Sequence, residues 1–172
     1  EWLQQIIQSF DDPKVGGAGG IVMDHTGVKP QYLYATANRL GIADTERQTP
    51  AQEYNFPQSY NFPYVQGTNS VFRRSALMDI GGFDAEFDFY LDETDLCCRL
   101  IDAGWRFEQR SDAIVHYIFL HSNIRNNAHV TRALSQVLKN KLYFTIIINH
   151  GHYLLTNSIH DNNQFVDYHR NY

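Results

Sequence analysis

The sequence reads Gly67-Thr68-Asn69-Ser70, Phe72-Arg73-Arg74, Gly81-Gly82-Phe83-Asp84, Asp92-Glu93-Thr94-Asp95-Leu96-Cys97-Cys98-Arg99 and, lastly, Val115-His116. These five blocks predict a tight turn, two short helices and an apolar strand that ends in histidine. Acidic residues gather at the start of the second helix. The segment 67–116 therefore indicates a carboxylate-based active site.

Length and composition limit the class of protein. The chain has 172 residues, 43% of them hydrophobic, which is typical of one soluble globular domain. Its formal net charge is -5 and it has no run of Lys or Arg, so no nucleic-acid partner is expected. We expect a domain over residues 1–150 and a C-terminal tail over residues 151–172 that is rich in Asn, His and Asp.

Cysteine usage and hydropathy indicate the compartment. Cys97 and Cys98 are neighbours on a predicted helix, so their side chains point in different directions and cannot pair, which favours a reducing compartment. No charged leader with an apolar core opens the sequence, and the longest apolar run, 142–148, is too short to cross a bilayer. A cytoplasmic, soluble protein is predicted.

Hydrophobic spacing predicts the elements before the central segment. Residues 1–10 have helical spacing, and the run 21–23, entered through the glycines of 16–20, is predicted as an interior strand. Residues 24–64 lack periodicity and are predicted as a long loop with some strand. In its part from Tyr54 to Tyr64, aromatic rings beside amides suit sugar binding, and packing of the rings on the core is an equal alternative.

The later elements are predicted from caps and periodicity. They are a helix over 75–80, a helix from 92 to about 103, short strands over 105–107 and 113–115 around a polar turn, and a helix over about 130–147. The first of these helices is expected to end at Gly81 or Gly82. The second is expected to have Asp92 as its cap and Asp95 in a capping box.

Glu93 lies in the first turn of the second helix, where unpaired N–H groups and the helix dipole stabilise negative charge. An ionised carboxylate there can accept a proton from a hydroxyl whose oxygen attacks carbon, which is general base catalysis. The alternative is that Asp92, Glu93 and Asp95 only cap the helix. Spacing alone leaves both interpretations open.

Arg99 and His116 each have a structural explanation. Arg99 lies four residues after Asp95, a spacing at which an acid–base pair stabilises a helix. His116 ends an apolar strand, where a lone histidine is more often structural than a metal ligand. A metal hydrolase built on Asp92, Asp95 and His116 has suitable ligand types but no i, i+4 pair of ligands, and it ranks last.

The blocks of the central segment resemble the second half of a family 2 glycosyltransferase with the GT-A fold. Members carry a Gly-x-Asn turn, an Arg-Arg pair, a Gly-Gly-Phe-Asp block, an acidic helix start and a strand that ends in Val-His. The matching residues here are Gly67-Thr68-Asn69, Arg73-Arg74, Gly81-Gly82-Phe83-Asp84, Asp92 to Arg99, and Val115-His116. The resemblance covers residues 1 to about 150. It implies an α/β, partial GT-A-like domain, a mixed sheet flanked by helices, with the N-terminal nucleotide-binding half missing from this chain.

The resemblance also implies roles for individual residues. The family's catalytic base falls on Glu93, while Asp92 stands where the family has Glu, so both are catalytic candidates. His116 matches a histidine that approaches the metal in some members, which makes it a metal-ligand candidate. The acceptor-binding candidates are Gly67, Thr68, Asn69, Asp95 and Arg99.

The implied reaction is inverting transfer of a sugar from a nucleotide-sugar donor to a saccharide or lipid-linked acceptor, as in polysaccharide biosynthesis. Departure of the nucleotide diphosphate needs Mg²⁺ or Mn²⁺, which the family holds with an Asp-x-Asp motif. No Asp-x-Asp occurs in this sequence. The complete enzyme is therefore expected to use the cation, whereas this chain alone is expected to bind none and to be inactive.

Two functional hypotheses follow. The first is the acceptor-side half of a glycosyltransferase, with Glu93 or Asp92 as base and the 54–64 loop helping to shape the acceptor pocket. It includes peripheral membrane association through the acceptor, and a homo-oligomer through an exposed sheet edge. The second is a non-catalytic carbohydrate-binding or assembly module that uses the same aromatic loop.

Overall fold

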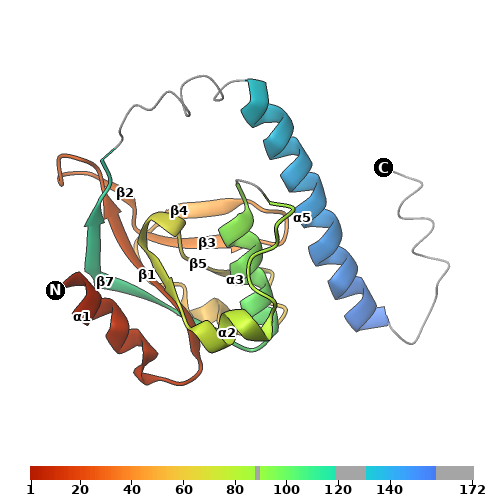
Figure 1. The fold of residues 1–172 in the computed structure, drawn as a ribbon, viewed down its shortest axis with the longest axis horizontal. Helices are drawn as coiled ribbons and strands as arrows, with labels where there is room; N and C mark the ends of the chain where they lie inside the picture. The colour runs from red at the N-terminus through yellow and green to blue at the C-terminus, as the bar shows by residue number, and fades with distance from the viewer. Residues whose placement is uncertain (88–89, 119–130, 158–172) are drawn as a thin grey trace.

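The fold consists of two small sheets with helices around them. The computed structural model describes residues 1–87, 90–118 and 131–157 (Figure 1). In chain order the elements are α1 (Trp2–Ile7), the 3-10 helix η1 (Gln8–Asp11), β1 (Val15–Met23), β2 (Pro30–Tyr32), β3 (Tyr34–Asn38), β4 (Ala43–Arg47), η2 (Gln52–Tyr54), β5 (Asn61–Tyr64), η3 (Gly67–Asn69), β6 (Ser70–Phe72), α2 (Arg74–Asp79), α3 (Asp92–Asp102), β7 (Arg106–His116) and α5 (Thr131–Asn157).

The glycine-rich strand β1 is the centre of the first sheet. It pairs parallel with β7 along one edge and antiparallel with β6 and β2 along the other. A Cβ at Gly17 would collide with the ring of Phe107, and one at Gly20 would collide with the carbonyl of Ala113. Only glycine permits such close approach. The predicted interior strand is therefore confirmed, and it is longer than the apolar run that indicated it.

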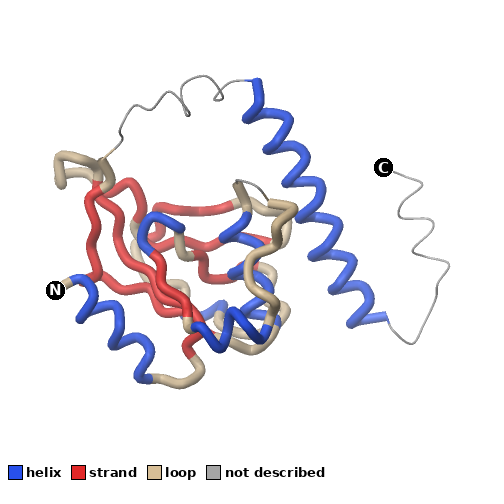
Figure 2. The backbone as a smooth tube through the Cα atoms, viewed as in Figure 1, coloured by secondary structure: helices blue, strands red, loops and turns tan. Residues whose placement is uncertain are grey.

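The second sheet has the order β4-β3-β5 and is antiparallel throughout. Figure 2 draws the strands of both sheets in red, between helices in blue. The second sheet lies within the segment 24–64, where a long loop with some strand was predicted, and the strand content is confirmed. The sequence did not locate the individual strands, because they have at most five residues and a register shift interrupts the pairing of β3 with β4. Alternation over so few residues gives no readable period.

The strand β7 is continuous, which corrects the prediction of two short strands around a polar turn. Gln109, one of its middle residues, is buried and bridges to the second sheet. Its Nε2 donates to the carbonyls of Ala35 and Tyr64, and its Oε1 accepts from the N–H of Ala51 at 2.9 Å. A glutamine whose amide replaces water in this way can occupy a core position. Its polar character alone suggested a turn.

Helix α3 supplies the core. Leu96, Leu100 and Ile101 are fully buried against Phe62 of β5 and Phe107 of β7. Cys97 and Cys98 are also buried, and both thiols are free. Aromatic and aliphatic residues of α5, Phe144 and Ile148, close the same cluster from the outer side of α3 (Figure 1). The core therefore holds α3 between the sheets and α5.

The predicted helices agree with the structure in their centres and differ at their ends. Helix α2 is followed by Gly81 and Gly82 at φ of 80° and 76°, as expected for glycines that end a helix. Helix α5 continues to Asn157, so residues 151–157 are helical, and 158–172 of the predicted tail lie outside the described residues. No helix in the described part of the chain is long and apolar enough to span a membrane.

Candidate active site

The start of α3 differs from the predicted capping box. Leu91 occupies the N-cap position in the left-handed conformation, with φ of 71°, and no side chain caps the helix. The N–H of Asp95 bonds to the carbonyl of Leu91 at 2.8 Å, which begins the helix through the backbone alone. Asp92 is the first helical residue, so neither its carboxylate nor that of Asp95 is used as a cap. The predicted cap by Asp92 and the capping box with Asp95 are therefore wrong, whereas the carboxylate of Glu93 does accept its own backbone N–H in the first turn.

Glu93 is turned toward the second sheet and the η3 turn. Burial is the main cause that raises its pKa to about 7, and the hydrogen bond and negative charge of Asp92 raise the pKa further. The N–H of Gly67 bonds to the carboxylate and opposes this shift. A carboxylate with a pKa near neutrality is poised to take a proton at physiological pH. Glu93 is thus the best general-base candidate in this site.

Two tyrosines complete the surroundings of Glu93. Tyr64, at the end of β5, has its pKa raised by burial and by the charge of Glu93. Tyr32, at the end of β2, has its pKa raised by the same two causes. Tyr32 and Tyr64 also line a small pocket together with Gln66 and Gln109, and the Oε1 of Gln66 is buried without a hydrogen-bond partner among the described residues. Glu93 does not itself line this pocket, so the two tyrosines are the residues that the pocket and the surroundings of the carboxylate share.

Glycine is required at position 67 because of the side chain of Glu93, and not because of the backbone conformation at Gly67. A Cβ at Gly67 would collide with Oε1 of Glu93. The colliding atom is the far end of a flexible side chain, so Glu93 would swing away instead of breaking the fold. The absence of a side chain at Gly67 therefore leaves the space that the carboxylate of Glu93 occupies.

We expect Gly67→Ala to displace the Glu93 carboxylate and to lower sugar transfer by about tenfold to a hundredfold, since a misplaced base loses its alignment. The free energy of unfolding should change by less than about 1 kcal/mol. Transfer kinetics of the full-length protein and chemical denaturation measure the two effects. Ser75→Ala, at an exposed position of α2, is the control. Equal activity in both variants would contradict the role of Gly67 in placing the carboxylate of Glu93.

Asn69 is buried and its side chain bonds within the fold. Its Nδ2 donates to the carbonyls of Ile21 and Ala113 at 3.0 and 2.9 Å. Its Oδ1 accepts from the indole N–H of Trp2 at 2.9 Å. The amide thus links α1, β1 and β7 beneath the turn that carries Gly67. A role of Gly67, Thr68 and Asn69 in acceptor binding remains a prediction.

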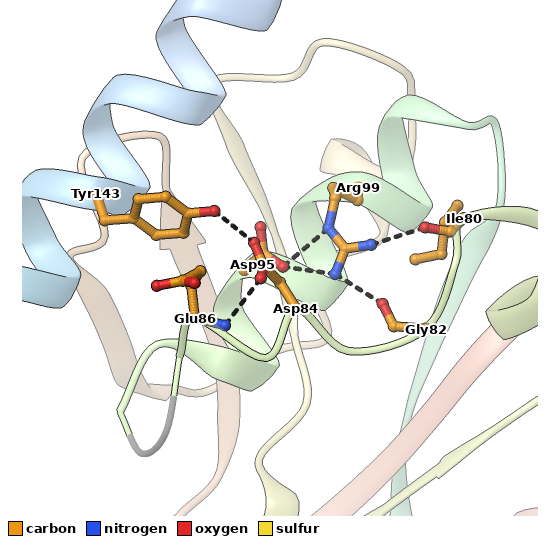
Figure 3. A network of polar contacts seen from close by, with 7 residues as sticks. All are labelled: Ile80, Gly82, Asp84, Glu86, Asp95, Arg99 and Tyr143. Atoms are coloured by element: carbon orange, nitrogen blue, oxygen red, sulfur yellow. Dashed lines mark hydrogen bonds and ion pairs between the residues drawn. The ribbon is translucent and has the colours of Figure 1, made fainter.

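Asp95 and Arg99 form the predicted pair, and it is part of a larger network (Figure 3). The guanidinium donates to Oδ2 of the fully buried Asp95 and to the carbonyls of Ile80 and Gly82, at 3.0 and 2.8 Å. Burial raises the pKa of Asp95 and outweighs the lowering by Arg99. The network ties α3 to the turn after α2. Whether the two residues also bind an acceptor remains a prediction.

His116 and the acidic residues do not converge on a metal site. His116 is exposed at the end of β7, and its Cε1 would lie 2.6 Å from a Cβ on Gly27. Among the described residues there is no group of three or more His, Cys, Asp and Glu that could hold a metal ion. The metal-hydrolase alternative therefore has no support. The described residues likewise do not fit a Mg²⁺ or Mn²⁺ site. A role of His116 as a metal ligand remains a prediction.

The aromatic loop lies away from Glu93. The N–H of Gln58 bonds to Asp102 at 2.8 Å, which places the loop at the C-terminal end of α3. This helix has 11 residues and is about 15 Å long, and Glu93 lies at its other end. Phe56 and Tyr60 are about half exposed there, at 52% and 55%. Tyr64, at the end of the loop, is the residue of this segment that approaches Glu93, and the help of the 54–64 loop in shaping an acceptor pocket remains a prediction.

Sequence reasoning missed two contributors to this site. Tyr32 belongs to a three-residue strand whose register cannot be read from the sequence. The left-handed residues Tyr90 and Leu91, with φ of 78° and 71°, carry no signal because glycine is the usual residue at such angles. Among the residues that surround Glu93, Gly67 and Asp92 are the ones that the sequence identified.

Comparison with known proteins indicates the class of enzyme to which this chain is similar. The chain is 35% identical, over 116 residues, to the pre-mycofactocin glycosyltransferase of Mycobacterium tuberculosis, equally in strains CDC 1551 / Oshkosh and ATCC 25618 / H37Rv. The chain is similar to a glycosyltransferase. The match covers 66% of this chain and 23% of each relative. No protein-family model matches the chain, and no solved structure matches it. The glycosyltransferase relationship expected from the sequence is supported, and family 2 and the GT-A fold remain predictions.

Proposed function

We propose that this chain forms the acceptor side of an inverting glycosyltransferase of family 2, with a GT-A-like fold and Glu93 as general base. The observation that supports this most is the half-buried carboxylate of Glu93, held between Asp92 and the N–H of Gly67 with a pKa of about 7. The similarity to a glycosyltransferase supports the class of reaction. The donor is a nucleotide sugar and the acceptor a saccharide or lipid-linked saccharide.

The proposed reaction transfers one proton, forms one bond at the anomeric carbon of the sugar and breaks another. The acceptor hydroxyl gives its proton to Glu93 while its oxygen bonds to the anomeric carbon. The bond from that carbon to the nucleotide diphosphate breaks, and the diphosphate leaves with the electron pair. Attack from the opposite face inverts the configuration of the sugar. When bound, Mg²⁺ or Mn²⁺ would neutralise charge on the diphosphate, and the described residues do not supply its ligands.

Asp92 acts on Glu93 in this proposal. Its carboxylate hydrogen-bonds to Glu93 and adds negative charge beside it, which disfavours ionisation of Glu93. The result is a stronger base than an ordinary glutamate, and it is still half ionised near neutral pH. Asp92 therefore raises the pKa of Glu93, while Glu93 itself contacts the substrate.

The pH dependence of transfer tests this proposal. A base with a pKa of about 7 must be deprotonated, so kcat/KM should rise about tenfold per pH unit below 7 and level off above it. Asp92→Asn removes the neighbouring charge and should move the inflection to lower pH. Asp44→Asn, on the exposed part of β4, is the control and should leave the inflection in place. A profile that stays flat between about pH 5 and 8 would overturn Glu93 as base.

A carbohydrate-binding module without chemistry is the second candidate. Its support is the exposure of Phe56 and Tyr60, since aromatic rings at a surface stack on sugars. These rings lie at the far end of α3 from Glu93. A binding module would retain saccharides without turnover of any nucleotide sugar in the full-length protein. The same assay therefore separates the two candidates.

A further inference from the structure

The backbone immediately before the acidic pair is strained. Tyr90 and Leu91 both have positive φ, at 78° and 71°, and neither is glycine. This conformation is unfavourable for a residue with a Cβ, so two in succession persist only where the surroundings hold them. The direction in which α3 begins depends on these two residues. Whatever holds them also sets where Glu93 points.

The turn is held by a side chain from a distant helix. The Nδ2 of Asn140, on α5, donates to the carbonyl of Tyr90 at 2.8 Å. Asn140 is fully buried, with 0% of its surface exposed. The Nε2 of Gln136 donates to Oδ1 of Asn140 at 3.0 Å, which turns the donor side of the amide toward Tyr90. A fully buried amide in such a chain of bonds has one favourable orientation.

Other residues on the same face of α5 hold the chain that leads to this turn. Lys139 donates to the carbonyl of Glu86 at 3.1 Å. The hydroxyl of Tyr143 donates to Asp84 at 2.9 Å, a contact visible in Figure 3. The ring of Phe87 packs against Tyr143, with centroids 5.1 Å apart. The contacts of α5 on this side are therefore concentrated on the segment that enters α3.

Apolar packing fixes the second strained residue. Leu91 is 6% exposed and belongs to the same buried cluster as Phe144 of α5. A Cβ on Gly41 would lie 3.3 Å from the side chains of both, so Leu91 and Phe144 are close neighbours. Asn140 and Phe144 are one turn apart on α5. One face of this helix thus contacts Tyr90 through a hydrogen bond and Leu91 through packing.

We propose that Asn140 is a positioning residue for the general base: by holding the carbonyl of Tyr90, it keeps α3 in the orientation that places the carboxylate of Glu93 against Gly67. The inference rests on the proposed function, because it assigns to α5 a part in the reaction of Glu93. Asn140 touches neither substrate nor base. Its effect passes through the backbone from Tyr90 to Asp92, which is a short and stiff path.

Asn140→Leu tests the inference, because leucine has a similar volume and no donor. We expect kcat for transfer by the full-length protein to fall between about tenfold and a hundredfold with donor KM unchanged. The titration of Glu93, followed by NMR of its labelled carboxyl carbon, should move in the same variant. Leu142→Asn is the reciprocal control on the exposed face of α5, where Leu142 is 65% exposed, and should change neither quantity.

A double variant separates positioning from a general loss of structure. Glycine adopts positive φ without strain, so Asn140→Leu should cost less in a Tyr90→Gly background than in the original chain. If Asn140→Leu does not fold, Asn140→Ser provides the same comparison with a shorter side chain that does not overfill the site. An unchanged Glu93 titration in the folded variant, or an equal loss of kcat in both backgrounds, would overturn the inference. The titration does not depend on turnover, so it tests Asn140 even if Glu93→Gln retains activity and the proposed function fails.

Discussion

Replacing Glu93 with glutamine is expected to lower kcat for sugar transfer by about a thousandfold while leaving donor affinity unchanged. Glutamine keeps the length of the side chain and can still accept the N–H of Gly67, but its amide oxygen cannot take up the proton of the acceptor hydroxyl. Steady-state transfer by the full-length protein and donor titration by calorimetry measure the two quantities. Glu46→Gln, on the exposed strand β4, is the matched control. Turnover of Glu93→Gln within tenfold of the unsubstituted protein would remove Glu93 as base.

The same substitution has an opposite effect on stability. The pKa of Glu93 is about 7 in the folded chain and near 4.5 in the unfolded chain, so the folded state binds more protons between these values. Stability contributed by this group is therefore lost as pH rises from about 4.5 to about 7. Glutamine does not titrate. The full shift corresponds to about 3 kcal/mol, and solvent screening of the half-buried carboxylate reduces it, so Glu93→Gln should raise the free energy of unfolding by about 2 kcal/mol above pH 7 relative to its effect at pH 4, as measured by urea denaturation at both pH values.

This combination distinguishes a functional carboxylate from a structural one. A group that holds the fold together destabilises it when removed, whereas an inactive variant that is more stable shows that the group is kept for its chemistry. If the effect of Glu93→Gln on the free energy of unfolding is the same at pH 4 and above pH 7, the burial that raises the pKa of Glu93 does not act as the structure indicates. The transfer result and the stability result are independent, so each can fail alone.

Replacing Arg99 with methionine is expected to lower the free energy of unfolding at pH 7 by about 3 kcal/mol, the largest loss of stability that we predict. Methionine preserves the aliphatic part of the side chain but leaves the fully buried carboxylate of Asp95 without its partner, and it frees the carbonyls of Ile80 and Gly82. Arg74→Met, at an exposed position of α2, is the control and should change stability by less than about 0.5 kcal/mol.

Low pH should reduce the loss caused by Arg99→Met. Without the guanidinium, burial and the charges of Asp84 and Asp92 act on Asp95 unopposed, and its pKa rises further above the ordinary range. A protonated carboxyl is less costly to bury, so the variant should approach the unsubstituted protein in stability as the pH falls. Adding Asp95→Asn should likewise recover part of the loss at pH 7. A small effect on unfolding together with a raised KM for acceptor would instead support the predicted acceptor-binding role of Arg99.

Elements set by local sequence were the ones that the sequence could predict. Asp95 and Arg99 are four residues apart on one helix, and their pairing follows from helical geometry alone. The stop of α2 at Gly81 and Gly82 is equally local. The interior position of β1 followed from a run of glycines that admits close neighbours on both sides.

The remaining features depend on contacts between distant residues. Glu93 meets Gly67 across a turn and a helix, and Asn140 meets Tyr90 across 50 positions of sequence. Gln109 is inside only because the carbonyls of Ala35 and Tyr64 come from the other sheet. Polarity and spacing do not specify such partners. The pKa of Glu93 also depends on burial, so its basicity could not be inferred from its place in a helix.

The two adjacent thiols in α3 give a way to observe this helix directly. Cys97 and Cys98 are fully buried, and burial raises the pKa of each well above its usual range. Neither sulfur can react with an alkylating reagent until the helix separates from its neighbours and the thiolate forms in water. The rate of alkylation therefore counts the openings of the segment that carries Glu93. Because the chain has only these two cysteines, the signal comes from that segment alone.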